Sequence, residues 1–102
     1  MPVHEITGEN YDEMVAGSRR PVLLEFGAEY CAPCRELAPV MKRISDERPD
    51  IMVGAVDVEK SPRVAAKLKV MSLPTVISLS GGKVTGRASG KITYEQVMDL
   101  LG

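Results

Sequence analysis

Two kinds of hydrophobic segment alternate along this chain. In one kind the apolar residues are consecutive, and in the other they have helical spacing. Continuous apolar runs predict strands that are buried within a sheet. A Gly-Gly pair between two such runs predicts a hairpin turn. The strands expected from these patterns cover residues 3–6, 21–26, 51–58, 75–79 and 83–88.

Apolar residues three and four positions apart predict the helices that connect these strands. Leu37, Met41 and Ile44 have this spacing and predict a long amphipathic helix over residues 34–48. Pro39 lies inside it and should bend this helix without ending it, because the apolar spacing continues beyond the proline. The other helices are expected at residues 11–16, at residues 63–69 and after Thr93, with Asn10, Ser61 and Thr93 as their N-caps.

The alternation of strands and helices indicates the fold class. Helices between strands imply right-handed parallel crossovers, and the closing hairpin adds antiparallel strands. A chain of 102 residues is long enough for one hydrophobic core and too short for two. We therefore expect a single α/β domain over residues 1–102, with a central mixed sheet of four to five strands flanked by four helices.

The composition and the net charge indicate which kinds of molecule this protein is not expected to bind. The content of 44% hydrophobic and 26% charged residues is typical of a soluble globular protein. The net charge of −1 provides no basic field for nucleic acid or an acidic membrane. No apolar run is long enough to span a membrane, and the first residues lack the pattern of a secretory signal. A cytoplasmic monomer is the expectation.

The chain has two cysteines, Cys31 and Cys34, in a C-x-x-C motif that directly follows the strand at 21–26. This spacing allows the first sulfur to lie at a helix N-terminus, where the helix dipole stabilises a thiolate. A thiolate with a second thiol in reach attacks a disulfide and then releases the product by closing its own ring. Cys31 lies at the mouth of the sheet and is the expected attacking sulfur, with the less exposed Cys34 resolving.

Two other interpretations of the cysteine pair are possible. Structural zinc requires four ligands, and the only further candidate among the cysteines and histidines is His4, so a metal would need a dimer that shares two pairs. A purely structural bridge that closes such a short loop contributes roughly 2 kcal/mol, against about 3 kcal/mol for a fifteen-residue loop. A redox-active pair is therefore favoured over both.

Across essentially its whole length the sequence resembles the thioredoxin family. A C-x-x-C motif alone is a weak signal, but here an apolar-Pro-Thr segment follows about forty residues later, within the expected order of elements. The matching segments are Val22-Leu23-Leu24-Glu25-Phe26, Ala28-Glu29-Tyr30-Cys31-Ala32-Pro33-Cys34, Pro39, Leu73-Pro74-Thr75, Gly81-Gly82 and Gly90. The resemblance implies a three-layer thioredoxin-like fold that reduces disulfides in target proteins without a bound cofactor or metal. A thioredoxin reductase-type electron donor would reduce it again.

The resemblance also implies how substrates bind. Pro74 would be a cis-proline beside the cysteine pair, and cis peptide bonds are essentially confined to proline. The backbone of Leu73 would then pair with an extended substrate segment. The expected substrate-binding residues are Tyr30, Ala32, Pro33, Met71, Leu73, Pro74 and Gly90.

Glu25 lies in an otherwise apolar strand, where a carboxylate is costly unless it has a task or a partner. Its position resembles that of the buried acid which, in thioredoxins, takes the proton from the second cysteine. Burial would raise the pKa of Glu25 toward neutrality, as suits a general base. The alternative is a glutamate at the strand end that faces solvent or pairs with a lysine.

The sequence departs from the family pattern at three positions near the motif. Gly27 and Tyr30 stand where the family usually has tryptophan, and Ala32 replaces a glycine. The missing ring at Gly27 should open space beside the site. The resemblance implies that the residues between the cysteines set the redox poise, and Ala-Pro is close to the Gly-Pro form that the reducing members of the family have. An oxidase or isomerase, a non-catalytic binding module and a metal-bridged dimer are the alternative functions.

Overall fold

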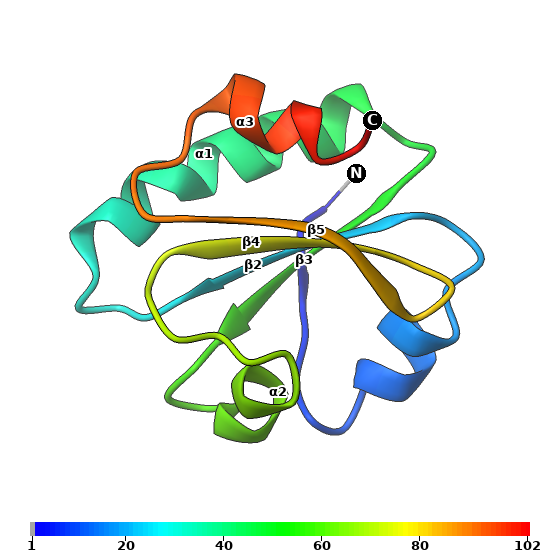
Figure 1. The fold of residues 1–102 in the computed structure, drawn as a ribbon, viewed down its shortest axis with the longest axis horizontal. Helices are drawn as coiled ribbons and strands as arrows, with labels where there is room; N and C mark the ends of the chain where they lie inside the picture. The colour runs from blue at the N-terminus through cyan, green and yellow to red at the C-terminus, as the bar shows by residue number, and fades with distance from the viewer. Residues whose placement is uncertain (1) are drawn as a thin grey trace.

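In the computed structural model, which describes residues 2–102, five strands form one mixed sheet (Figure 1). The strands are β1 (His4–Glu5), β2 (Val22–Gly27), β3 (Met52–Asp57), β4 (Thr75–Ser80) and β5 (Lys83–Ser89). Their order across the sheet is β1-β3-β2-β4-β5. β1, β3 and β2 run parallel, whereas β4 is antiparallel to β2 and β5 is antiparallel to β4. The predicted mixed sheet is confirmed.

The described chain contains four helices, which cover both faces of this sheet. They are η1 (Asp12–Ala16), α1 (Ala32–Glu47), α2 (Pro62–Lys67) and α3 (Tyr94–Asp99). Figure 1 shows α1 and α3 on one face of the sheet, and α2 with the blue η1 on the other. The result is the expected three-layer α/β architecture.

The two faces of β2 contribute to two separate hydrophobic cores. Val22, Leu24 and Phe26 pack into the core on the side of η1 and α2, whereas Leu23 packs with residues of α1. Because side chains alternate along a strand, Glu25 and Gly27 share the face of Leu23. The only carboxylate in β2 therefore lies between the sheet and α1.

The longest helix, α1, begins at Ala32, two residues before the predicted start. Cys31 is its N-cap, and Pro33 fits the first turn because the amide hydrogens there have no partner within the helix. The apolar spacing that marked this helix starts only at Leu37 and missed Ala32 and Pro33, whereas the C-x-x-C spacing placed Cys31 at the helix N-terminus, which is confirmed. The helix continues through Pro39, as predicted.

One of the three predicted N-caps is wrong, and a second takes its position without a side-chain hydrogen bond. Asn10 does not cap η1; its side-chain oxygen accepts from the Thr7 N–H at 2.8 Å, and its amide donates to the Glu5 carbonyl at 2.9 Å. Asn10 thus closes the turn before the helix. Ser61 occupies the N-cap position of α2, but its side chain makes no capping hydrogen bond.

The third cap and the hairpin turn form as predicted. Thr93 and Gln96 make a reciprocal capping box, with the Thr93 N–H donating to Gln96 Oε1 at 2.8 Å. Gly81 and Gly82 connect β4 to β5 with φ angles of +58° and +80°, a conformation that glycine adopts without steric cost. Both features were readable from local sequence alone.

Candidate active site

The cysteine pair lies where β2 gives way to α1. Cys31 caps the helix, and its Sγ accepts a hydrogen bond from the backbone N–H of Cys34 at 3.3 Å. The two cysteines form a disulfide, with their Cα atoms 5.3 Å apart. Cys31 is 9% exposed and Cys34 5% exposed. The first sulfur is thus held at the helix N-terminus, where the dipole favours negative charge.

Pro74 lies at the same end of the sheet as the cysteines. Thr75 pairs with Phe26 in the antiparallel ladder, so Pro74 precedes β4 at the end where β2 leads to Cys31. The Leu73–Pro74 peptide bond is cis, as the resemblance implied. The Gly90 N–H donates to the Pro74 carbonyl at 3.1 Å, so that two predicted substrate-binding residues lie together.

The other predicted rim residues are mostly exposed. The side chains of Tyr30 and Met71 are 71% and 93% exposed, and Ala32 and Pro33 are exposed as well. Leu73 is half-buried and packs against the core beneath α2. Tyr30, Ala32 and Pro33 flank Cys31 in the chain, whereas Met71 lies in the loop before β4 and its place in the rim stays a prediction.

Glu25 is buried beneath α1, with only 7% of its surface exposed. It lies opposite Ala55 of β3 and Val76 of β4, neither of which offers a charge or a side-chain hydrogen bond. No hydrogen bond or ion pair joins its carboxylate to another residue in 2–102. Burial raises the pKa of Glu25 from 4.5 to about 7. The solvent-facing or lysine-paired alternative is therefore wrong for this position.

A cleft of about 250 Å³ exposes part of both Glu25 and Cys34. Gly27 forms one wall, and a Cβ added there would lie 3.3 Å from Cys34 Sγ and 3.9 Å from Glu25 Oε2. The added Cβ would also lie 3.0 Å from Cys34 Cβ, so the open space expected from the missing ring is not found directly above Gly27. Two further walls, Ala38 and Ala55, come from α1 and β3. Sequence reasoning missed both, because nothing in the local pattern shows that these alanines face each other.

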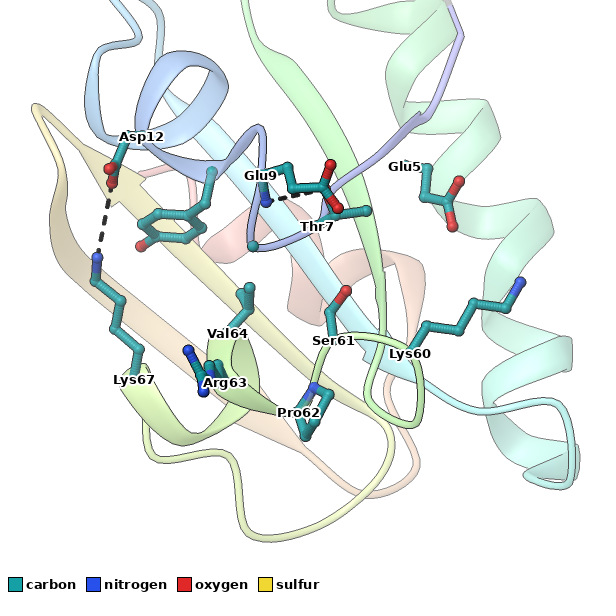
Figure 2. Close-up of a pocket in the computed structure, with 12 residues that line it drawn as sticks. Glu5, Thr7, Glu9, Asp12, Lys60, Ser61, Pro62, Arg63, Val64 and Lys67 are labelled. Carbon is teal, nitrogen blue, oxygen red and sulfur yellow. Dashed lines mark hydrogen bonds and ion pairs between the residues drawn. The ribbon is translucent and has the colours of Figure 1, made fainter.

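A larger pocket, of about 720 Å³, lies between the β1–η1 loop and α2 (Figure 2). Its acidic side chains come from residues 5–12 and its basic side chains from residues 60–67. Figure 2 shows Lys67 reaching toward Asp12, and the two charged groups are 3.9 Å apart. The Lys67 ammonium also lies 4.5 Å from the centre of the Tyr11 ring. No cysteine lines this pocket, so it is separate from the redox chemistry.

Residues 2–102 also bear on two other kinds of site, a metal centre and a membrane span. No three histidine, cysteine, aspartate or glutamate side chains lie close enough together to hold a metal ion. Within the same residues, no helix is both long enough and apolar enough to cross a membrane.

Reversible formation of one sulfur–sulfur bond at a helix start is the chemistry that this arrangement allows. A capped sulfur can attack a disulfide, and a second sulfur within bonding distance can release the product. The fold and the site therefore define a thiol–disulfide oxidoreductase.

Comparison with known proteins identifies the family. The thioredoxin family model matches residues 2–101. A thioredoxin-like protein from Synechocystis is 37% identical over 90% of this chain and 89% of its own length. The thioredoxin of Chlamydia trachomatis is 33% identical over 97% of this chain and 95% of its own length. A bifunctional thioredoxin reductase/thioredoxin from Mycobacterium leprae is 37% identical over 84% of this chain, which spans only 19% of that protein.

The chain belongs to the thioredoxin family. Its activity is dithiol–disulfide exchange with protein disulfides through Cys31 and Cys34.

Proposed function

We propose that Cys31 attacks the target disulfide, that Cys34 resolves the mixed disulfide, and that the cycle runs in the reducing direction. The Cys31 thiolate bonds to one target sulfur and expels the other as a thiolate. Cys34, after losing its proton, attacks Cys31, so that the target leaves with two thiols and the pair is oxidised. The observation that carries this assignment is the position of Cys31 at the N-cap, with its Sγ accepting the Cys34 N–H.

The surroundings of the sulfurs support the reducing direction. A pair whose thiolate is strongly stabilised is a good oxidant, because its reduced form is favoured. Here one N–H at 3.3 Å contacts the Cys31 sulfur, and the buried carboxylate of Glu25 lies near Cys34. A carboxylate disfavours a second negative charge nearby. The carboxylate of Glu25 therefore limits the stabilisation of a thiolate at this site and favours a pair that gives its electrons away, against the single stabilising hydrogen bond to Cys31.

We infer that Glu25 receives the proton of Cys34. A general base works best when its pKa is near the operating pH, and burial brings the pKa of Glu25 to about 7. Cys34 Sγ and Glu25 Oε2 flank the same point beside Gly27.

The oxidised pair must be reduced again by a partner. We propose a thioredoxin reductase-type donor, which is supported by the relative in which the two activities share one chain. Such a cycle suits a compartment with a reducing thiol pool, so we place the protein in the cytoplasm as a monomer. The net charge of −1 provides no field for nucleic acid or for an anionic membrane surface.

Single-cysteine variants test the assignment of the two sulfurs. With NADPH, a thioredoxin reductase and insulin as the disulfide substrate, Cys31→Ser should show no insulin reduction. Cys34→Ser should accumulate a mixed disulfide with insulin, which a mass increase of the non-reduced protein would reveal. Insulin adducts on Cys31→Ser, or none on Cys34→Ser, would reverse or remove the assigned roles.

Equilibration with a glutathione redox series then tests the direction of the cycle. A reductant stays oxidised until the buffer is far more reducing than a typical disulfide isomerase requires. A pair that is already reduced in mildly oxidising glutathione would instead indicate an oxidase or an isomerase.

A further inference from the structure

We propose that the cleft beside Cys34 admits small cationic or uncharged thiols, which reduce the oxidised pair by attacking Cys34 instead of Cys31. This inference rests on the exchange chemistry proposed above and adds a second substrate class and a second point of entry.

The cleft is formed by small residues that face one another across the sheet–helix boundary. Glu25 pairs with Ala55, and Gly27 pairs with Asp57, in the parallel ladder of β2 and β3. Above them lies the first half of α1, which contributes Cys34, Arg35 and Ala38 to the walls of the cleft. Gly27, Ala38 and Ala55 have small side chains or none, and the cleft that they help to line has a volume of about 250 Å³ and includes Cys34 in its wall.

The cleft opens on a different side from the protein-substrate rim. β3 neighbours β2 on one edge, and β4, which begins after Pro74, neighbours it on the other. The cleft uses residues of β3, whereas the predicted rim uses Pro74 and Gly90. A small molecule in the cleft would therefore reach Cys34 without occupying the place of an extended peptide.

Attack on Cys34 produces the better leaving group. A thiolate RS⁻ bonds to Cys34 Sγ, the disulfide breaks, and its electron pair leaves on Cys31 Sγ. That sulfur is the N-cap of α1 and accepts the Cys34 N–H, so the new negative charge forms where the helix dipole favours it. A second thiolate attacks the R sulfur, gives RSSR and leaves Cys34 as a thiolate that takes up a proton.

Size and charge select the thiol. A volume of about 250 Å³ holds a few heavy atoms and excludes a folded substrate segment. Glu25, Glu29 and Asp57 line the cleft against one cation, Arg35. Glu25 points into it without a hydrogen bond or ion pair to any other residue of the described chain. Anionic thiols, glutathione included, are therefore disfavoured, and aminothiols are preferred.

The test compares three thiols on the oxidised full-length protein: cysteamine, 2-mercaptoethanol and 3-mercaptopropionate, at equal thiolate concentration. We expect rates in that order, with about a tenfold difference between the cation and the anion at low salt, which shrinks as salt screens the charges. Acid quenching followed by fragment mass spectrometry should locate the transient mixed disulfide on Cys34. Equal rates for the three thiols, or an adduct on Cys31, would overturn the proposal.

Cleft-filling variants provide the second arm. Ala38→Leu fills the space from α1 and Ala55→Val from β3, so one remains informative if the other does not fold. Each should slow reduction by cysteamine severalfold and leave insulin reduction through the reductase within about twofold. Ala66→Leu, which changes an exposed alanine of α2 outside the cleft, is the matched control and should match the wild type. Unchanged cysteamine rates in folded cleft variants would refute the inference.

The two proposals fail in distinguishable ways. If wild-type protein does not reduce insulin, the proposed function falls. If it reduces insulin while cysteamine attacks only Cys31, the proposed function stands and the cleft is not an entry route.

Discussion

Replacing Glu25 by glutamine should change the pH dependence of folding stability, because the substitution removes a buried ionisable group. The folded-state pKa of Glu25 is raised by burial from 4.5 to about 7. When the folded-state pKa of an acid is raised, the folded protein retains a proton that the unfolded chain releases. The free energy of unfolding contributed by this group is therefore fully present below pH 4.5 and declines as the pH rises to about 7.

The size of the effect follows from the same shift. One pKa unit corresponds to about 1.4 kcal/mol, so ionisation of Glu25 costs the folded state about 3 kcal/mol at alkaline pH. Because the cleft lets solvent reach part of the carboxylate, about 3 kcal/mol is the upper limit of this cost. The Glu25→Gln protein should become more stable than the wild type by up to that amount as the pH rises from acidic to alkaline values. Any fixed difference at acidic pH reflects the exchange of an acid for an amide.

Urea unfolding of the oxidised proteins, followed by circular dichroism at about pH 4, 5.5 and 8.5, measures this difference. Glu36→Gln is the matched control, because it changes an exposed carboxylate on α1 and removes no buried charge. A stability difference for Glu25→Gln that stays constant over the whole pH range would refute the reasoning, since it would mean that burial does not penalise the charged form.

Three further predictions address activity and packing. The pH–rate profile of insulin reduction by Glu25→Gln should lose its inflection near pH 7, whereas an unchanged profile would exclude a proton-transfer role. Tyr30→Ala should raise the KM for insulin severalfold. It should change the free energy of unfolding by less than about 0.5 kcal/mol, because Tyr30 is 71% exposed. Val84→Ala on β5 is the control, because it removes exposed apolar surface away from the site. Gly54→Ala should destabilise by about 1–3 kcal/mol in denaturant titrations, because a Cβ there would lie 2.6 Å from Ile6 Cγ1; a neutral result would show that β1 shifts freely.

Much of the fold was predictable because its signals are local. The apolar run of β2, the spacing of Leu37, Met41 and Ile44, and the capping box at Thr93 each lie within a few residues. Helix starts were less predictable. The first turn of α1 has no apolar periodicity. The side chain of Asn10 bonds within the turn before η1 instead of capping that helix.

The site was predictable in part for the same reason. The motif spacing placed Cys31 and Cys34, and the resemblance of Glu25 to the buried acid of the family predicted its burial, which is confirmed. The order of the strands and the pairing of Glu25 with Ala55 depend on contacts between distant segments. A single sequence does not show which residues contact one another, so it does not reveal that Ala38 and Ala55 line a cleft beside Glu25.

The N-cap role of Cys31 ties the conformational stability of the longest helix to electron transfer. Its sulfur accepts the first hydrogen bond of α1 in the oxidised state, and reduction places a negative charge on that same acceptor. Folding and reduction thus share one thermodynamic cycle. The difference in unfolding free energy between the oxidised and the reduced protein must equal the difference in reduction free energy between the unfolded and the folded cysteine pair. The redox potential can therefore be tuned through the stability of the first turn of α1, independently of how tightly a substrate binds.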